Sequence, residues 1–262
     1  MPMKDRIVEE LDGIEKTRNV KIVLAVESGS RAWGFPSNDS DYDVRFIYVH
    51  EKDWYLTIFK KRDIIEIPIE ELLDINGWDL RKSLQLMRKS NSPLFEWLSS
   101  PIRYRVSKRA FKKLEELSRL SFMPKTACYH YLSISKKYIE EIESNEKVRL
   151  KAYMYAIRAT LCCKWIVQNL TQPPMNIKDL LTEIHEDRAI TDTVVRFIQE
   201  KKKYPENHSI NHSELVENYM KQTLHDVQES IPKNPKKPGS EIYDDVFGFI
   251  VNSEFSKVDE IA

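Results

Sequence analysis

A glycine–serine pair and two aspartates between two apolar runs constrain this chain more than any other feature. Lys21 to Val26 and Tyr42 to Val49 have the length and composition of strands. Asp41 and Asp43 stand two residues apart, and side chains at positions i and i+2 of a strand share a face, about 7 Å apart. Two carboxylates on one face repel each other, so the spacing favours a divalent cation such as Mg²⁺ beside them.

The glycine–serine pair supplies the second half of the pattern. Gly29 and Ser30 follow the first strand and open a turn-rich segment that ends at Ser40. Glycine lets the backbone approach a ligand closely, and hydroxyl and N–H groups at a helix start can hold a triphosphate. Arg31 adds a fixed positive charge. With the aspartates, these residues predict a triphosphate site with two Mg²⁺ ions about 4 Å apart.

The chain changes from strand-rich to helical near Pro101. Residues 3–17 have a helical apolar pattern, residues 62–69 form a third expected strand, and a helix is expected from Asp79. Beyond Pro101 there is almost no strand pattern, and five segments suit helices: 107–120, 126–144, 146–170, 177–202 and 212–230. The sequence therefore predicts an α+β fold with an all-helical C-terminal region. The expected divisions are a catalytic domain at 1–105, a helical domain at 106–232, and a loop and C-terminal tail at 233–262.

Composition excludes some classes of protein. The chain has 41 basic and 41 acidic residues, so no strong global attraction to nucleic acid is expected, although local basic patches remain open. Cys128, Cys162 and Cys163 lack the spacing of a metal site and fit a reducing cytoplasm. No apolar run approaches about 18 residues, so we expect a cytoplasmic protein without a membrane partner.

The motifs resemble a known pattern. Gly29-Ser30-Arg31-Ala32-Trp33-Gly34, followed after five residues by Ser40-Asp41-Tyr42-Asp43-Val44, resembles the signature of the DNA polymerase β-type nucleotidyltransferase superfamily. Together with RDIIEIPI, LDINGWDLRKSLQLM and KAYMYAIR, it is similar to the nucleotidyltransferases encoded beside RNA ligases in bacteria and phages. The likeness covers roughly residues 20 to 175.

The resemblance implies a small mixed β-sheet nucleotidyltransferase core backed by helices. It also implies transfer of a nucleoside monophosphate from a nucleoside triphosphate such as ATP, with Mg²⁺ or alternatively Mn²⁺. In that superfamily the residues matching Asp41 and Asp43 bind metal, and those matching Gly29 and Ser30 contact the triphosphate. A third carboxylate comes from a neighbouring strand. Glu66 is our first choice for a catalytic and metal-binding role, and the alternatives are Asp63, Asp74 and Asp79.

Further nucleotide contacts are expected from two helices. Lys82 lies in the first turn of the helix after Asp79, where a basic side chain opposes the helix dipole and hints at an anion. Lys151, Tyr155 and Arg158 share one helical face in the KAYMYAIR segment, which the resemblance includes. Asp79 itself suits the N-cap position of the helix that follows it.

The function expected from these residues is metal-dependent nucleotidyl transfer to an acceptor hydroxyl, with an RNA end in repair or processing as the favoured acceptor. Transfer to a protein or small molecule is an alternative. A second alternative is a nucleotide-binding partner of an RNA ligase that does not turn over its nucleotide. The sequence does not specify the preferred base or the oligomeric state.

Overall fold

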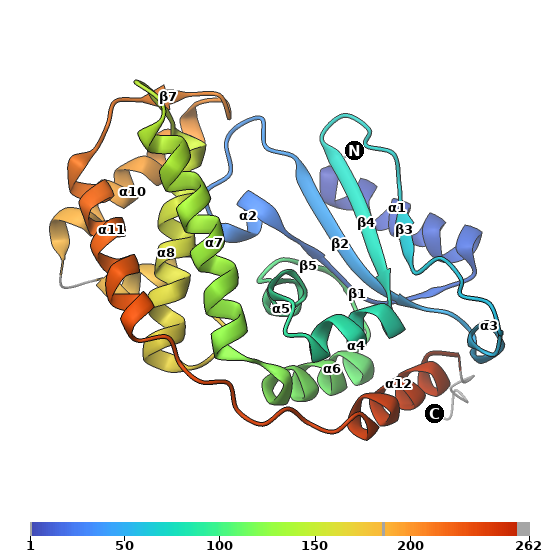
Figure 1. Cartoon of the computed structure of the whole chain (residues 1–262). Coiled ribbons are helices and arrows are strands. Elements are labelled where there is room, and N and C mark those ends of the chain that lie inside the picture. The colour runs from blue at the N-terminus through green and yellow to red at the C-terminus, as the bar shows by residue number, and fades with distance from the viewer. Residues whose placement is uncertain (1, 185–186, 256–262) are drawn as a thin grey trace. The chain divides into compact units, whose positions relative to one another are not determined.

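The computed structural model describes residues 2–184 and 187–255, which form two compact units (Figure 1). The sheet unit comprises residues 2–28, 42–121 and 237–255. The helical unit comprises residues 29–41, 122–184 and 187–236. This division differs from the expected boundaries at 105 and 232, because residues 106–121 and the end of the described chain both pack with the sheet. It also assigns the glycine–serine motif to the helical unit.

A five-stranded mixed sheet organises the sheet unit. Its order is β3-β4-β2-β1-β5, with bounds Lys21–Glu27 (β1), Tyr42–Val49 (β2), Ile64–Glu66 (β3), Leu73–Asp79 (β4) and Arg103–Val106 (β5). β2 and β4 are parallel, and the other neighbouring strands are antiparallel. The expected α+β class is therefore confirmed, as are the strands at β1 and β2.

Helix α1 (Met3–Arg18) covers one face of this sheet. Its buried residues Ile7, Leu11 and Ile14 meet Val44 and Ile75, which belong to the central strands. Side chains alternate along a strand, so the neighbours of these apolar residues point to the other face. As a result, the face of β2 and β4 that points away from the core carries a row of polar side chains, the polar stripe.

The remaining helices of the sheet unit are α3 (Lys52–Tyr55), α4 (Leu80–Arg88), α5 (Ser92–Ser99), α6 (Lys108–Ser121) and α12 (Glu241–Phe255). α4 packs against β2 and β4, and α6 packs against β1 (Figure 1). Asp79 caps α4 as expected, because its Oδ1 accepts a hydrogen bond from the Arg81 amide at 2.8 Å.

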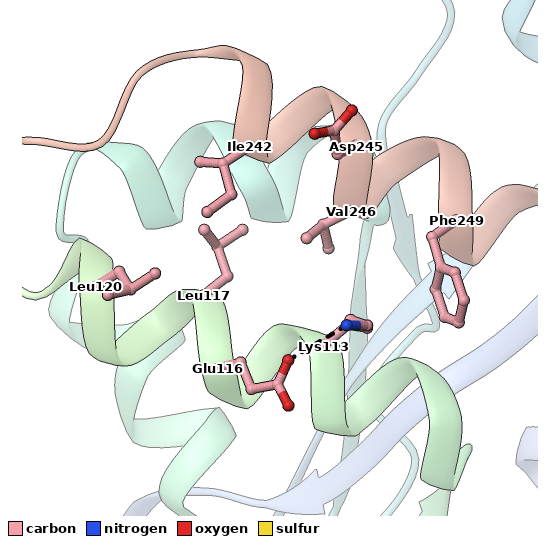
Figure 2. Close-up of a pocket in the computed structure, with 8 residues that line it drawn as sticks. All are labelled: Lys113, Glu116, Leu117, Leu120, Ile242, Asp245, Val246 and Phe249. Carbon is pink, nitrogen blue, oxygen red and sulfur yellow. Dashed lines mark hydrogen bonds and ion pairs between the residues drawn. The ribbon is translucent and has the colours of Figure 1, made fainter.

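The last described helix, α12, occupies part of the expected C-terminal tail. It lies beside α6, and Ile242 and Val246 point towards Leu117 across a groove of about 370 Å³ (Figure 2). The sequence does not predict this helix, because the proline-rich segment before it and Gly248 within it both disfavour helix. Burial of its apolar face against α6 and α4 compensates for that weak propensity.

In its described residues, the helical unit contains four helices of 16 or 20 residues and a short antiparallel strand pair. Its elements are α2 (Gly29–Trp33), α7 (Pro124–Glu143), β6 (Val148–Arg149), α8 (Leu150–Asn169), α9 (Ile177–Leu180), η1 (Leu181–Ile184), α10 (Arg188–Lys203), β7 (Ser209–Ile210) and α11 (Glu214–Glu229). α7 and α8 run side by side (Figure 1). Cys128, Cys162 and Cys163 are buried free thiols here. No helix in the described part of the chain has the length and apolar character needed to cross a bilayer.

Gly77 gives β4 the room to pair with β2. It lies directly opposite Phe46, and a Cβ built at Gly77 would overlap the buried Phe46 ring. We expect Gly77→Ala to lower the free energy of unfolding by about 1–3 kcal/mol, because a filled core has no space for another methyl group. Urea unfolding measures the change.

The same substitution at Gly13 is the matched control. A Cβ there meets nothing within 4 Å, and Gly13 lies inside helix α1. Because alanine favours helix over glycine by about 1 kcal/mol, Gly13→Ala should raise stability. Equal effects of the two substitutions would contradict the packing account of Gly77.

We expect His50 to make the stability of the sheet unit depend on pH. Its ring stacks on Trp54 with centroids 3.8 Å apart, and burial, with Lys61 nearby, lowers its pKa to about 4. In the unfolded chain the ring takes up its proton near pH 6.5, so stability should fall as pH drops from 6.5 towards 4. We expect a loss of up to about 3 kcal/mol, which unfolding at stepped pH values will measure.

A variant without the imidazole separates this effect from the protonation of carboxylates. His50→Gln should show a flatter dependence of stability on pH between 6.5 and 4. His225→Gln, which changes an exposed histidine, should leave the wild-type slope unchanged. Identical slopes for wild type and His50→Gln would refute the assignment.

Candidate active site

Asp43 and Asp74 form a carboxylate pair on the polar stripe of the sheet. They are direct partners in the parallel register of β2 and β4. Opposed residues point to the same face, and both side chains are partly exposed, at 30% and 28%. Their sequence neighbours Val44 and Ile75 enter the core on the α1 side. The sheet therefore presents two carboxylates side by side on the face away from α1.

Arg45 bridges this pair. Its Nη2 donates to Asp43 Oδ1 at 2.9 Å and to Asp74 Oδ2 at 2.7 Å. Its Nη1 donates to the backbone carbonyls of Val44 and Asp74. The guanidinium thus compensates the repulsion between the carboxylates. Sequence reasoning missed Arg45, although its position two residues after Asp43 places it on the same face of the strand.

Glu27 holds the backbone of Asp43 in place. This carboxylate is fully buried at the end of β1, and its Oε1 accepts a hydrogen bond from the Asp43 amide at 2.8 Å. The Tyr104 hydroxyl donates to its other oxygen. The Ser28 amide donates to the Asp43 carbonyl at 2.8 Å. Both polar groups of the Asp43 backbone are therefore fixed, a second feature that the sequence analysis did not predict.

Glu66, the first choice for the third carboxylate, lies on the strand beyond β4, one strand further from Asp43 than Asp74 is. It sits on the edge strand β3 opposite Asn76, is 54% exposed, and forms an ion pair with Arg62 at 2.5 Å. Of the alternatives, the structure brings Asp74 beside Asp43. Asp79 instead caps α4 and accepts a hydrogen bond from Tyr55 at 2.7 Å, while burial raises its pKa.

Lys82 also lies away from the carboxylate pair. It follows the far end of β4, where Asp79 stands five positions after Asp74, a distance of roughly 17 Å along the strand. Its ammonium pairs with Asp63 at 3.3 Å. Within the sheet unit, the expected nucleotide contact of Lys82 therefore does not share a site with Asp43.

The glycine–serine motif forms a serine-rich loop in the helical unit. Gly29 has φ 60°, which favours glycine, and Ser30 lies in the short helix α2. The Ser30 hydroxyl is buried and donates to Ser40 Oγ at 3.2 Å. Ser40 Oγ also accepts from the Ser37 amide at 2.9 Å. The expected phosphate ligand Ser30 thus belongs to a cluster of three hydroxyl groups.

Arg31 closes this loop. Its Nε donates to the Asp41 carbonyl at 2.9 Å, and its Nη2 donates to the Ser40 carbonyl at 2.6 Å. These bonds tie the beginning of the segment to its end, so that Arg31 positions the backbone on both sides of Ser40. A direct contact of Arg31 with phosphate stays a prediction.

Helix α8 anchors the loop through the residues expected to contact nucleotide. The Arg158 guanidinium lies 4.4 Å from the centroid of the Trp33 ring, and its Nε donates to the Met175 carbonyl. Tyr155 meets Trp33 edge-on at 5.0 Å. Phe35, fully buried, packs against both Trp33 and Tyr155. Because Arg158 is itself buried, the role that the structure shows for it is to pack against the loop.

The side chains at the carboxylate pair indicate whether a metal ion would fit there. Asp43 and Asp74 offer oxygen ligands alone, which suit Mg²⁺ or Mn²⁺, and Arg45 already places a cation between them. In residues 2–184 and 187–255, no three His, Cys, Asp or Glu side chains are grouped to hold a metal. The pair therefore fits a divalent cation that receives at least one further ligand.

The α+β fold with its mixed sheet is that of a nucleotidyltransferase-like protein, as the comparison with a family model shows. The model of the RNA repair pathway DNA polymerase beta family (RlaP) matches residues 3–248, and the chain belongs to this family.

Two further proteins are similar to the chain. The uncharacterized protein YcgL of Bacillus subtilis (strain 168) is 46% identical over 201 residues, which cover 77% of each chain. A nucleotidyltransferase-like protein from Exiguobacterium sibiricum 255-15, solved by crystallography, is 11% identical with a TM-score of 0.31. That match covers 96% of this chain and 81% of the other.

Removing Arg45 tests the electrostatics of the pair. Arg45→Met leaves two carboxylates without their bridging cation, so we expect the free energy of unfolding at pH 7 to fall by about 1–3 kcal/mol. Millimolar Mg²⁺ should restore most of the loss, because a bound cation replaces the guanidinium charge. Denaturant unfolding with and without Mg²⁺ measures both effects.

Arg62→Met is the matched control. Its ion pair with Glu66 is mostly exposed, so its loss should cost less than about 1 kcal/mol and should not respond to Mg²⁺. If Mg²⁺ stabilised both variants equally, the cation would be binding away from the Asp43–Asp74 pair, and the prediction would be wrong.

Proposed function

We propose that the chain is a metal-dependent nucleotidyltransferase that transfers a nucleoside monophosphate from a nucleoside triphosphate to an RNA end. The observation that carries the proposal is the Asp43–Asp74 pair, side by side on parallel strands with Arg45 between the carboxylates. Membership of the family supports nucleotidyl transfer as the class of reaction. The family's description supports RNA repair as its setting.

Asp43 and Asp74 would hold the metal together with one further ligand, the role that the family resemblance implies for Asp41. Asp41 stands two residues before Asp43 and completes the motif that the family resemblance implies. Bound Mg²⁺ or Mn²⁺ would supply charge neutralisation for the phosphates and for the attacking oxygen. We place Asp74 in the role of the third carboxylate, in preference to Glu66, because Asp74 is the one in register with Asp43.

The chain's own residues would do the positioning. Glu27 and Ser28 fix the Asp43 backbone, so that its carboxylate is aimed before any ligand arrives. Gly29 and Ser30 would contact the triphosphate, while Arg31 keeps their loop closed. Such preorganisation is the main contribution a protein makes to phosphoryl transfer, where little covalent work falls on side chains.

Substitution of the carboxylates tests the proposal. We expect Asp43→Asn and Asp74→Asn each to lower nucleotidyl transfer to an RNA oligonucleotide by about 10³-fold or more, because each removes a charged metal ligand. Glu66→Gln, which changes an exposed carboxylate of the same sheet, should remain within about threefold of wild type. Transfer is followed with labelled nucleoside triphosphates and by release of pyrophosphate.

The acceptor is tested in the same assay. Label on RNA, with salt-dependent binding of that RNA, supports the proposal. Label on a protein substrate or a small molecule in place of RNA would overturn the acceptor, and nucleotide binding without pyrophosphate release would overturn the enzyme. Full activity in Asp74→Asn with loss in Glu66→Gln would reverse our assignment of the third carboxylate.

A further inference from the structure

A second pocket of the sheet unit lies between helices α4 and α12. Its volume is about 310 Å³, which is at the lower end of the range for small-molecule sites. Helix α4 begins where β4 ends, so this pocket lies towards the opposite end of β4 from Asp74. It is therefore separate from the carboxylate pair, and all of its lining residues belong to the sheet unit.

Three polar side chains of α4 line one wall of this pocket. Arg81, Gln85 and Arg88 stand at positions i, i+4 and i+7, so they share one face of the helix, and all three are exposed. The guanidinium carbon of Arg81 lies 4.8 Å from the ring centroid of Tyr55 and 5.4 Å from that of Phe247. The two rings therefore hold the Arg81 guanidinium beside the pocket.

Neither guanidinium is neutralised by an acid of the chain. Across residues 2–184 and 187–255, Arg81 and Arg88 form no ion pair, although Asp244 lines the same pocket. Asp79, which precedes α4, accepts hydrogen bonds from the Arg81 amide and from the Tyr55 hydroxyl. Two unpaired arginines beside one pocket favour an anion, and the fork of a guanidinium matches the oxygens of phosphate.

The position of Arg81 in its helix favours the same kind of ligand. Arg81 lies in the first turn of α4, where the positive end of the helix dipole disfavours a cation. A bound anion would offset both the dipole and the side-chain charge. The basic start of this helix, noted in the sequence at Lys82, thus has a pocket beside it.

The α12 wall of the pocket narrows the class of anion. Asp244 and Ser240 are exposed there, while Leu84, Tyr243 and Phe247 supply apolar surface. A carboxylate repels inorganic phosphate, but it accepts hydrogen bonds from the hydroxyl groups of a ribose. A ligand that carries both a phosphate and a sugar satisfies the arginines and the aspartate together.

We infer that this pocket binds a ribonucleotide, with its phosphate on Arg81 and Arg88 and its ribose hydroxyls on Asp244. The apolar surface of the pocket would cover the sugar and the near edge of the base. A free ribonucleotide and the terminal nucleotide of an RNA share this chemistry, and the experiment below distinguishes them. The inference does not depend on the proposed transfer reaction.

Calorimetric titration of the full chain tests the inference. The probes are AMP, 2′-deoxy-AMP and adenosine, in EDTA, so that the Asp43–Asp74 pair cannot recruit nucleotide through a metal. Wild type should bind AMP about tenfold more tightly than either of the other two. Adenosine lacks the group that the arginines bind, and 2′-deoxy-AMP lacks a hydroxyl that the aspartate binds.

Substitutions assign each part of the ligand to its residue. Arg88→Gln should weaken AMP by about tenfold and leave adenosine unchanged, because only the phosphate contact is lost. Asp244→Ala should bind AMP and 2′-deoxy-AMP equally. Lys89→Gln and Asp245→Ala are the matched controls, each one residue on and exposed, and should bind as wild type does. Asp245 lines the neighbouring groove instead (Figure 2).

Thermal unfolding without ligand separates binding from folding. Arg88 and Asp244 are exposed, so Arg88→Gln and Asp244→Ala should unfold at the wild-type temperature. Unchanged AMP affinity in Arg88→Gln, retained discrimination in Asp244→Ala, or equal losses in the two controls would overturn the inference.

RNA oligonucleotides identify the source of the nucleotide. If 5′-phosphorylated RNA binds more tightly than AMP and Arg88→Gln weakens it, the pocket takes an RNA end. If Arg88→Gln weakens AMP and leaves RNA unchanged, the pocket takes a free ribonucleotide. These titrations need neither metal nor turnover, so a failure to detect nucleotidyl transfer would overturn the proposed function and leave this site standing.

Discussion

The parallel pairing of β2 with β4 is the constraint on which the sheet unit depends. In this register Asp43 and Asp74 meet on one face, while Val44 and Ile75 enter the core beneath α1. A slip of one residue in either strand would carry a carboxylate into that apolar layer, at a cost of several kcal/mol. The hydrophobic pattern that folds the sheet therefore also sets the position of the carboxylates.

Electrostatic compensation follows from the same register. Arg45 stands two residues after Asp43, which places its guanidinium on the carboxylate face and within reach of both acids. On the opposite side, Glu27 is a buried carboxylate whose cost is offset by the Asp43 amide and the Tyr104 hydroxyl. Arg45 thus holds the two carboxylates, and Glu27 holds the Asp43 backbone, before any ligand binds.

The sequence predicted strands β1 and β2, whose composition agrees with their place, and missed β4 and the short β5. β1 and β2 are apolar and β-branched, whereas β4 contains Asp74, Asn76 and Gly77, which are depleted in strands. Each has a reason that appears only in three dimensions: Gly77 makes room for Phe46, and the two polar residues lie on the polar face. The sequence predicts a strand over 62–69 with Glu66 at its centre, but β3 spans only Ile64–Glu66, so Glu66 lies at its end.

Lys201 shows which signal in a sequence would have revealed a buried charge. The lysine run suggests solvent, yet Lys201 continues the apolar stripe of Ile190, Val194 and Phe197 at helical spacing. Lys202 and Lys203 lie off that stripe and are exposed. A charged residue at a core position is costly without a partner, and Lys201 has one in the Ser37 hydroxyl. The same reasoning finds Arg45 from its place in the strand, because a cation in register with two carboxylates is a partner already supplied by the chain.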